Sequence, residues 1–136
     1  MFIFLDTETT GTEKDDRLCQ LAFKLESGEI VNKLFKPPLP IAIEPMSVHH
    51  ITNEMVADKP TFKGGHDHQK LVALLNDDKN ILVAHNTKFD VNMLIKEGVH
   101  PIKGYLYFES RQAPIPHTTG SLTKAEPAPF TAAWWR

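Results

Sequence analysis

The chain has little cysteine, little net charge and no long apolar run. Cys19 is the only cysteine among the 136 residues, so no disulfide can form within the chain and a reducing, cytoplasmic setting is expected. The opening apolar run, residues 2–5, is too short for a signal peptide or a membrane span. The formal net charge of −2 argues against a polyanion held by bulk positive charge, although metal ions or a local basic groove could still hold one.

Two apolar segments predict strands buried on both faces, at residues 2–6 and 81–84. Apolar residues alternate with polar ones at 21–25, and Ser27-Gly28 then turns the chain into residues 30–35, which predicts a hairpin. Prolines between 37 and 45 predict an extended connector.

Three helices are expected. The first spans residues 53–57, the second follows a solvated cap at Asp67, and the third spans 87–97 with Gly98 as its C-terminal cap. A further strand is possible at 105–108. The order of these elements predicts an α/β fold in which helices flank a mixed sheet.

The first signal of chemistry is the segment Phe4-Leu5-Asp6-Thr7-Glu8-Thr9-Thr10-Gly11. A strand places side chains at i and i+2 on the same face, so Asp6 and Glu8 should project together. Like charges side by side are unfavourable unless a cation neutralises them, and hard oxygen ligands suit Mg²⁺ or Mn²⁺. The plainer alternative is a solvated strand end with Asp6 in a turn.

The second signal is Val83-Ala84-His85-Asn86-Thr87-Lys88-Phe89-Asp90, in which a strand ends and a helix begins with Asp90 in its first turn. An acidic residue in that position also complements the helix dipole without any metal. Asn86 or Thr87 could equally serve as the helix cap. Either segment alone is a moderate signal.

In combination the two segments resemble the first two motifs of the DEDD (DnaQ-like) exonuclease superfamily, whose fold is ribonuclease H-like. The intervening Val48-His49-His50-Ile51-Thr52 and Pro60-Thr61-Phe62 are similar to the connecting segment of the polymerase III epsilon-like proofreading subunit. The resemblance covers residues 1–104. It implies a metal-dependent 3′–5′ exonuclease that acts on the single-stranded 3′ end of DNA in proofreading or repair, with a DNA polymerase or other replication protein as a partner and no membrane association.

The resemblance also implies roles for individual residues. Two divalent ions, Mg²⁺ or Mn²⁺, would be held by Asp6, Glu8 and Asp90, with Asp6 bridging both, Glu8 on the ion that carries the attacking water, and Asp90 on the other. The terminal nucleotide would be contacted by Thr9, Thr10, Asn86, Phe89 and His50, with local structural roles as alternatives for the last two.

The third motif of that superfamily, His-x4-Asp or Tyr-x3-Asp, has no match, because no aspartate follows Asp90. The composition also changes: from 113 to 136, Pro, Ala and Thr supply thirteen of twenty-four residues. We therefore expect a partial exonuclease domain at 1–104 and an atypical tail at 105–136, either an out-of-frame extension or a divergent native one. Nuclease activity should then be weak or absent.

Two alternative functions stay open from the sequence. One is an RNA 3′–5′ exonuclease of the same superfamily. The other is a non-catalytic nucleic-acid-binding protein.

Overall fold

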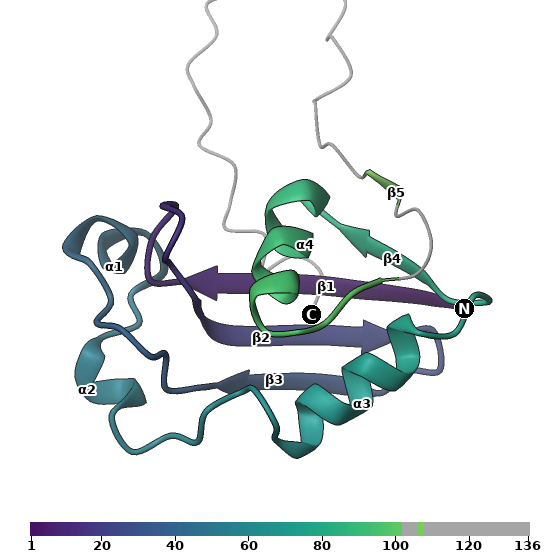
Figure 1. Ribbon diagram of the computed structural model, residues 1–136, viewed down its shortest axis with the longest axis horizontal. Helices are drawn as coiled ribbons and strands as arrows, with labels where there is room; N and C mark the ends of the chain where they lie inside the picture. The colour runs from purple at the N-terminus through teal and green to yellow at the C-terminus, as the bar shows by residue number, and fades with distance from the viewer. Residues whose placement is uncertain (102–105, 108–136) are drawn as a thin grey trace, which may run out of the picture.

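A five-stranded mixed sheet forms the centre of the computed structural model, which describes residues 1–101 and 106–107 (Figure 1). The strand order is β3-β2-β1-β4-β5. The pairs β1–β2 and β2–β3 are antiparallel, whereas β1–β4 and β4–β5 are parallel. The predicted mixed sheet and hairpin are confirmed, and β1–β2 adds a second antiparallel pair. The strands are β1 (Phe2–Thr9), β2 (Leu18–Leu25), β3 (Ile30–Leu34), β4 (Ile81–Ala84) and β5 (Leu106–Tyr107).

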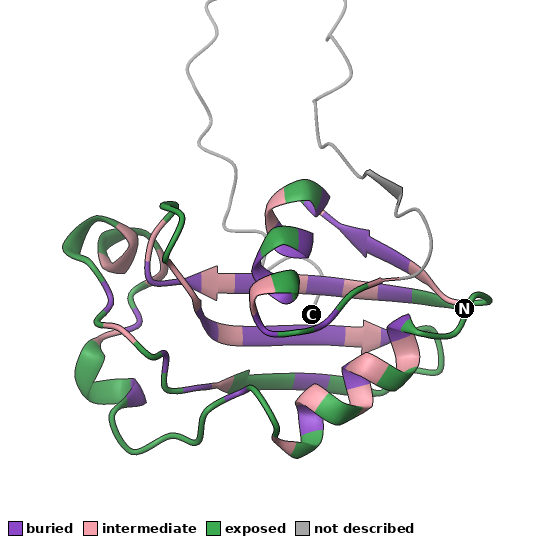
Figure 2. Cartoon of the chain, viewed as in Figure 1, coloured by how far each residue is buried: buried purple, intermediate pink, exposed green. Residues whose placement is uncertain are grey.

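Two of the helices cover one face of the sheet and two lie beyond the end of β1 (Figure 1). Helices α3 (His66–Leu75) and α4 (Thr87–Lys96) form the covering layer. Their apolar faces pack with the strands in one core. Buried residues occur along β1, β2, β4 and both helices (Figure 2). Helices α1 (Ile43–His49) and α2 (Asn53–Val56) lie beside the end of β1. The shared core includes Ile3, Leu5, Phe23, Leu71, Leu75, Val91 and Leu94.

The extended connector predicted around the prolines is only partly correct. The chain is irregular through Pro40, but residues 43–49 form α1 with Pro45 inside its first turn. Proline is tolerated there because the first backbone N–H groups of a helix have no partner within it. No residue of α1 is buried, so the sequence lacked the apolar helical period that would have revealed it.

The prediction that Asp67 is a solvated cap is wrong. Gly65 occupies the N-cap position of α3, and Asp67 is buried in the first turn. Its Oδ2 accepts a hydrogen bond from Lys33 Nζ at 2.9 Å, which compensates the buried charge. The cation comes from β3, far away in sequence, and this explains why local sequence did not reveal it.

The expected αL residue after the last main helix is confirmed. Helix α4 ends at Lys96, and Gly98 has φ +78°. No helix within the described residues is long and apolar enough to cross a membrane.

Candidate functional site

Strand β1 carries Asp6 and Glu8 on one face of the sheet, as their spacing predicts. Odd-numbered residues of β1 from Ile3 are buried against the helices, whereas Asp6 and Glu8 are half-buried on the opposite face. The strand extends to Thr9 instead of ending at Asp6, so both carboxylates belong to regular strand. Pairing with β2 places Asp6 opposite Ala22 and Glu8 opposite Gln20, and the register shifts directly after Glu8.

Helix α4 brings the third carboxylate to the same strand. Asp90 lies in the first turn of α4, which begins directly after β4 and packs on β1 and β4. The residue is buried, and its Oδ1 accepts a hydrogen bond from Thr7 Oγ1 at 2.6 Å. Two segments separated by 83 positions are thereby joined.

Burial raises the pKa of all three carboxyl groups, and repulsion from neighbouring carboxylates adds to the shift of Glu8 and Asp90. Burial raises the pKa of Asp6 from 3.8 to about 6, against an opposing hydrogen bond with the Thr7 backbone. Burial, followed by the charges of Asp6 and Asp90, raises the pKa of Glu8 from 4.5 to about 7. Burial raises the pKa of Asp90 from 3.8 to about 7, opposed by the Thr7 hydroxyl and reinforced by Asp6. The three groups therefore form one electrostatically coupled set.

The chemistry of this set fits a hard divalent cation. Carboxylate oxygens are the ligands that Mg²⁺ and Mn²⁺ prefer, and a cation would relieve the repulsion that helps to raise the pKa of Glu8 and Asp90. Within the described residues, no lysine, arginine or histidine forms an ion pair with Asp6, Glu8 or Asp90. Nor do three His, Cys, Asp or Glu side chains in that part of the chain converge closely enough to hold a metal ion as they stand. Binding would therefore require at least one of the three carboxylates to turn toward the others.

The hydroxyls of Thr9 and Thr10, both predicted to lie near the substrate, have acceptors within the protein. Thr9 Oγ1 donates to the carbonyl of Gly11 at 2.7 Å, and Thr10 Oγ1 donates to Asp16 Oδ1 at 2.6 Å. Both threonines are buried. Their contact with a nucleotide stays a prediction.

His49 and His50 differ in role although they are adjacent. The backbone N–H of Ile51 donates to His49 Nδ1 at 3.0 Å, so the proton lies on Nε2, which donates to the Thr9 carbonyl at 2.9 Å. His49 thereby holds the end of α1 against the end of β1. His50 is exposed and has φ 60°, the left-handed conformation that ends α1.

Asn86 and Phe89 flank Asp90 at the start of α4. Asn86 occupies the N-cap position but makes no side-chain capping hydrogen bond, and it is exposed. The alternative in which the Asn86 side chain caps the helix therefore finds no support in the structure. Phe89 is half-buried.

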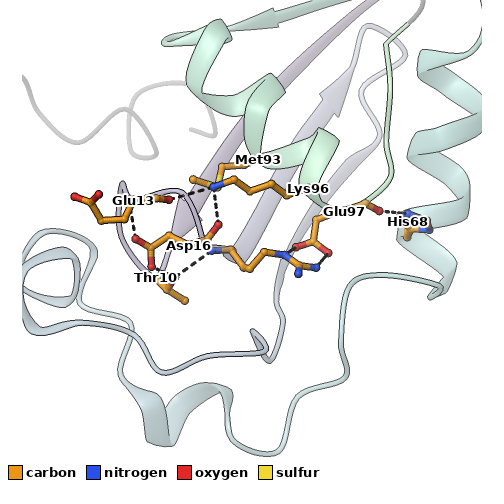
Figure 3. Close-up of polar contacts among 8 residues, drawn as sticks. Thr10, Glu13, Asp16, His68, Met93, Lys96 and Glu97 are labelled. Carbon is orange, nitrogen blue, oxygen red and sulfur yellow. Dashed lines mark hydrogen bonds and ion pairs between the residues drawn. The ribbon is translucent and has the colours of Figure 1, made fainter.

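A clamp that the sequence did not reveal joins the loop after β1 to the end of α4 (Figure 3). Arg17 Nε and Nη2 donate to the two carboxylate oxygens of Glu97 at 2.7 and 2.8 Å. This hydrogen bonding raises the pKa of Arg17. Lys96 Nζ donates to the carbonyls of Asp16 at 2.9 Å and Glu13 at 3.2 Å. The loop that follows Asp6 and Glu8 is thus fixed to the helix that carries Asp90.

Further contacts join Glu97 to α3 and hold the loop after β1 together internally (Figure 3). The Glu97 carbonyl lies 2.7 Å from His68 Nε2. Inside the loop, Asp16 accepts from the Thr10 hydroxyl and from the Glu13 backbone N–H at 2.8 Å. The sequence shows a glutamate, Glu97, at the end of this helix, but only the folded structure shows that it is buried.

The mixed sheet and its helices are similar to those of solved exonucleases, and they define an α/β domain of the ribonuclease H-like class. The model of the exonuclease family matches residues 3–113. The chain belongs to this exonuclease family, whose members are hydrolases acting on nucleic acids.

Three individual proteins illustrate the similarity. The uncharacterized exonuclease CP81 of Escherichia phage 186 is 29% identical over 98% of this chain and 69% of that protein. The DNA polymerase III subunit epsilon of Buchnera aphidicola is 35% identical over 70% of this chain and only 43% of that subunit. The structure of exonuclease X in complex with 5′ overhanging duplex DNA has a TM-score of 0.53 and 28% identity, over 69% of this chain and 54% of the other.

Proposed function

We propose that this chain is a metal-dependent 3′–5′ exonuclease that hydrolyses DNA, of the proofreading or repair type. One observation carries the proposal: β1 and α4 bring Asp6, Glu8 and Asp90 into one electrostatically coupled set within an exonuclease-family fold. Buried carboxylates that raise one another's pKa are costly, and such sets cluster at functional sites.

Asp6, Glu8 and Asp90 would hold Mg²⁺ or Mn²⁺. Bound divalent ions would lower the pKa of the attacking water and stabilise charge on the departing 3′ oxygen. The protein's own part is to keep the three carboxylates on a rigid strand and helix, half-shielded from water. Asn86 and Phe89 lie beside Asp90 at the start of α4, and with His50 they would position the terminal nucleotide, with Thr9 and Thr10 shaping the backbone beside it.

DNA is the favoured substrate because the relatives include a DNA polymerase III subunit and an exonuclease whose structure contains DNA. A DNA polymerase or other replication protein is the favoured partner for the same reason. An RNA substrate is the nearest rival.

We further propose that hydrolysis by these 136 residues is slow. No aspartate follows Asp90, so the fourth carboxylate and the base expected from the superfamily have no counterpart in the sequence. Loss of a general base alone typically slows a reaction by about 10²–10⁴-fold.

The test is a nuclease assay at enzyme excess with 5′-labelled single-stranded DNA and matched RNA, in Mg²⁺ or Mn²⁺. We expect slow, stepwise shortening of DNA from its 3′ end that EDTA abolishes. Asp6→Asn should abolish it as well, whereas Asp78→Asn, at an exposed turn, should not. Faster loss of RNA would favour the RNA exonuclease.

Two further outcomes would count against the proposal. DNA binding that survives EDTA without any shortening would identify a non-catalytic binding protein. Turnover at ordinary enzymatic rates that Asp6→Asn abolishes would keep the nuclease but contradict the proposed slow hydrolysis.

A further inference from the structure

Thr7 lies between Asp6 and Glu8 in sequence, but its side chain occupies the opposite face of the sheet. Alternation along β1 turns Thr7 toward the helices, where it is 6% exposed. A buried hydroxyl needs a hydrogen-bond partner inside the protein. That partner is the Asp90 carboxylate: Thr7 Oγ1 donates to Asp90 Oδ1 at 2.6 Å in a buried contact.

This bond links the strand that carries two carboxylates to the helix that carries the third. Asp90 is in the first turn of α4, and the backbone of Thr7 and of Asn86 acts with the Thr7 hydroxyl to lower its pKa against the effect of burial. A short, buried hydrogen bond restricts the orientations that a carboxylate can adopt. The orientation of Asp90 is therefore set from β1, the strand of Asp6 and Glu8.

We propose that Thr7 is a positioning residue, which orients Asp90 for a divalent cation shared with Asp6 and Glu8. The proposal rests on the proposed function, because it assumes that these carboxylates bind metal. Hydrogen-bonding partners of metal-ligating side chains typically contribute about 10–100-fold in metal affinity. Thr7 would contribute by holding one ligand ready, without touching metal or substrate.

The plainer account is that the hydroxyl merely satisfies a buried polar group. The two accounts predict different results for metal affinity. A structural role alone would lower thermal stability when the hydroxyl is removed and leave the intrinsic affinity of the folded protein for metal unchanged. A positioning role would weaken metal affinity as well.

The experiment measures the dissociation constant for Mn²⁺ by electron paramagnetic resonance, together with the melting temperature, for a set of variants. Thr7→Val keeps the shape and removes the hydroxyl, whereas Thr7→Ser keeps the hydroxyl. Thr52→Val is the matched control, since the Thr52 hydroxyl accepts from the Met55 N–H at the start of α2, away from the carboxylates.

We expect Thr7→Val to weaken Mn²⁺ binding by at least about tenfold. Thr7→Ser should stay near the wild-type value, and Thr52→Val should lower only the melting temperature. If Thr7→Val does not fold, comparison of Thr7→Ala with Thr7→Ser isolates the hydroxyl, because both lack the methyl group.

Equal Mn²⁺ affinity in wild type and the hydroxyl-free variant would overturn the positioning role. If instead wild type binds no Mn²⁺ that Asp6→Asn removes, the proposed function itself fails, and the inference fails with it. The two failures are therefore distinguishable.

Discussion

At the residue scale, the acidic side chains of β1 and α4 are where folding and electrostatics oppose each other. Asp6 and Glu8 are half-buried and Asp90 is buried, so the folded state holds three carboxyl groups out of water. Without a cation, the protein minimises this cost by binding protons. With one, the same charges become favourable.

This opposition predicts that the metal-free protein loses stability as pH rises. The folded-state pKa values, about 6 for Asp6 and about 7 for Glu8 and Asp90, exceed the ordinary values of 3.8 to 4.5. The folded state thus binds more protons between about pH 4 and 7, and the free energy of unfolding falls as pH rises through that interval. Urea unfolding at a series of pH values measures the slope.

The matched variant for this measurement is Asp6→Asn/Glu8→Gln/Asp90→Asn, which should show a flatter pH dependence. The difference between the two proteins also excludes the contribution of the histidines to the pH dependence, because both proteins contain the same histidines. Identical slopes in the two proteins would contradict the prediction.

Gly11 shows a second constraint at the residue scale. A Cβ at this position would lie 2.4 Å from Asp16 Oδ2, too close for any real contact. Gly11→Ala should therefore displace the Asp16 carboxylate from the Thr10 hydroxyl and the Glu13 N–H, at a cost of about 1–2 kcal/mol. A double-mutant cycle with Asp16→Ala checks the cause: the two effects should be clearly less than additive, and full additivity would exclude this mechanism.

At the element scale, α4 is held at both ends, to β1 at its start and to the loop after β1 at its end. Thr7 holds the first turn through Asp90, and Arg17 holds the last through Glu97. Because the Glu97 side chain is 4% exposed and the Arg17 side chain 26%, this pair is more shielded than a surface ion pair.

We predict that Arg17→Met destabilises the protein by about 2 kcal/mol, since it leaves the buried Glu97 carboxylate without its cation. Lys70→Met is the control, because its partner Glu29 is half exposed; this change should cost less than about 1 kcal/mol. Urea unfolding of both variants gives the comparison. Similar costs for the two would mean that the clamp is no stronger than an ordinary surface pair.

Most elements were predictable because their signals are local. Alternation revealed β2, and glycine at 98 marked the end of α4. Helix α1 escaped prediction because it buries no residue, and Asp67 was misplaced because its cation, Lys33, lies on another element. The same reason hid Thr7 and Glu97: the sequence shows the residue but not the partner that gives it a role.

At the scale of the whole molecule, the sequence predicts a division of the chain into a partial exonuclease domain, 1–104, and an atypical tail, 105–136. The boundary at residue 104 remains a prediction, and all of 105–136 except Leu106 and Tyr107 lies outside the described residues. The alignment with the phage 186 protein covers 98% of the chain, whereas that with the Buchnera subunit covers 70%. The nucleotide sequence after codon 104 distinguishes the two origins: a His-x4-Asp motif in a shifted frame is expected for an out-of-frame tail, and its absence would favour a native one.

The central claim is that Asp6, Glu8 and Asp90 form a divalent-metal site. Titration of the metal-free protein with Mn²⁺, followed by electron paramagnetic resonance, tests it most directly, with Asp6→Asn and Asp90→Asn as site variants and the exposed Asp78→Asn as control. The account predicts saturable binding to wild type and Asp78→Asn that is lost or strongly weakened in both site variants. Undiminished binding to Asp6→Asn and Asp90→Asn, or no binding to wild type, would contradict it.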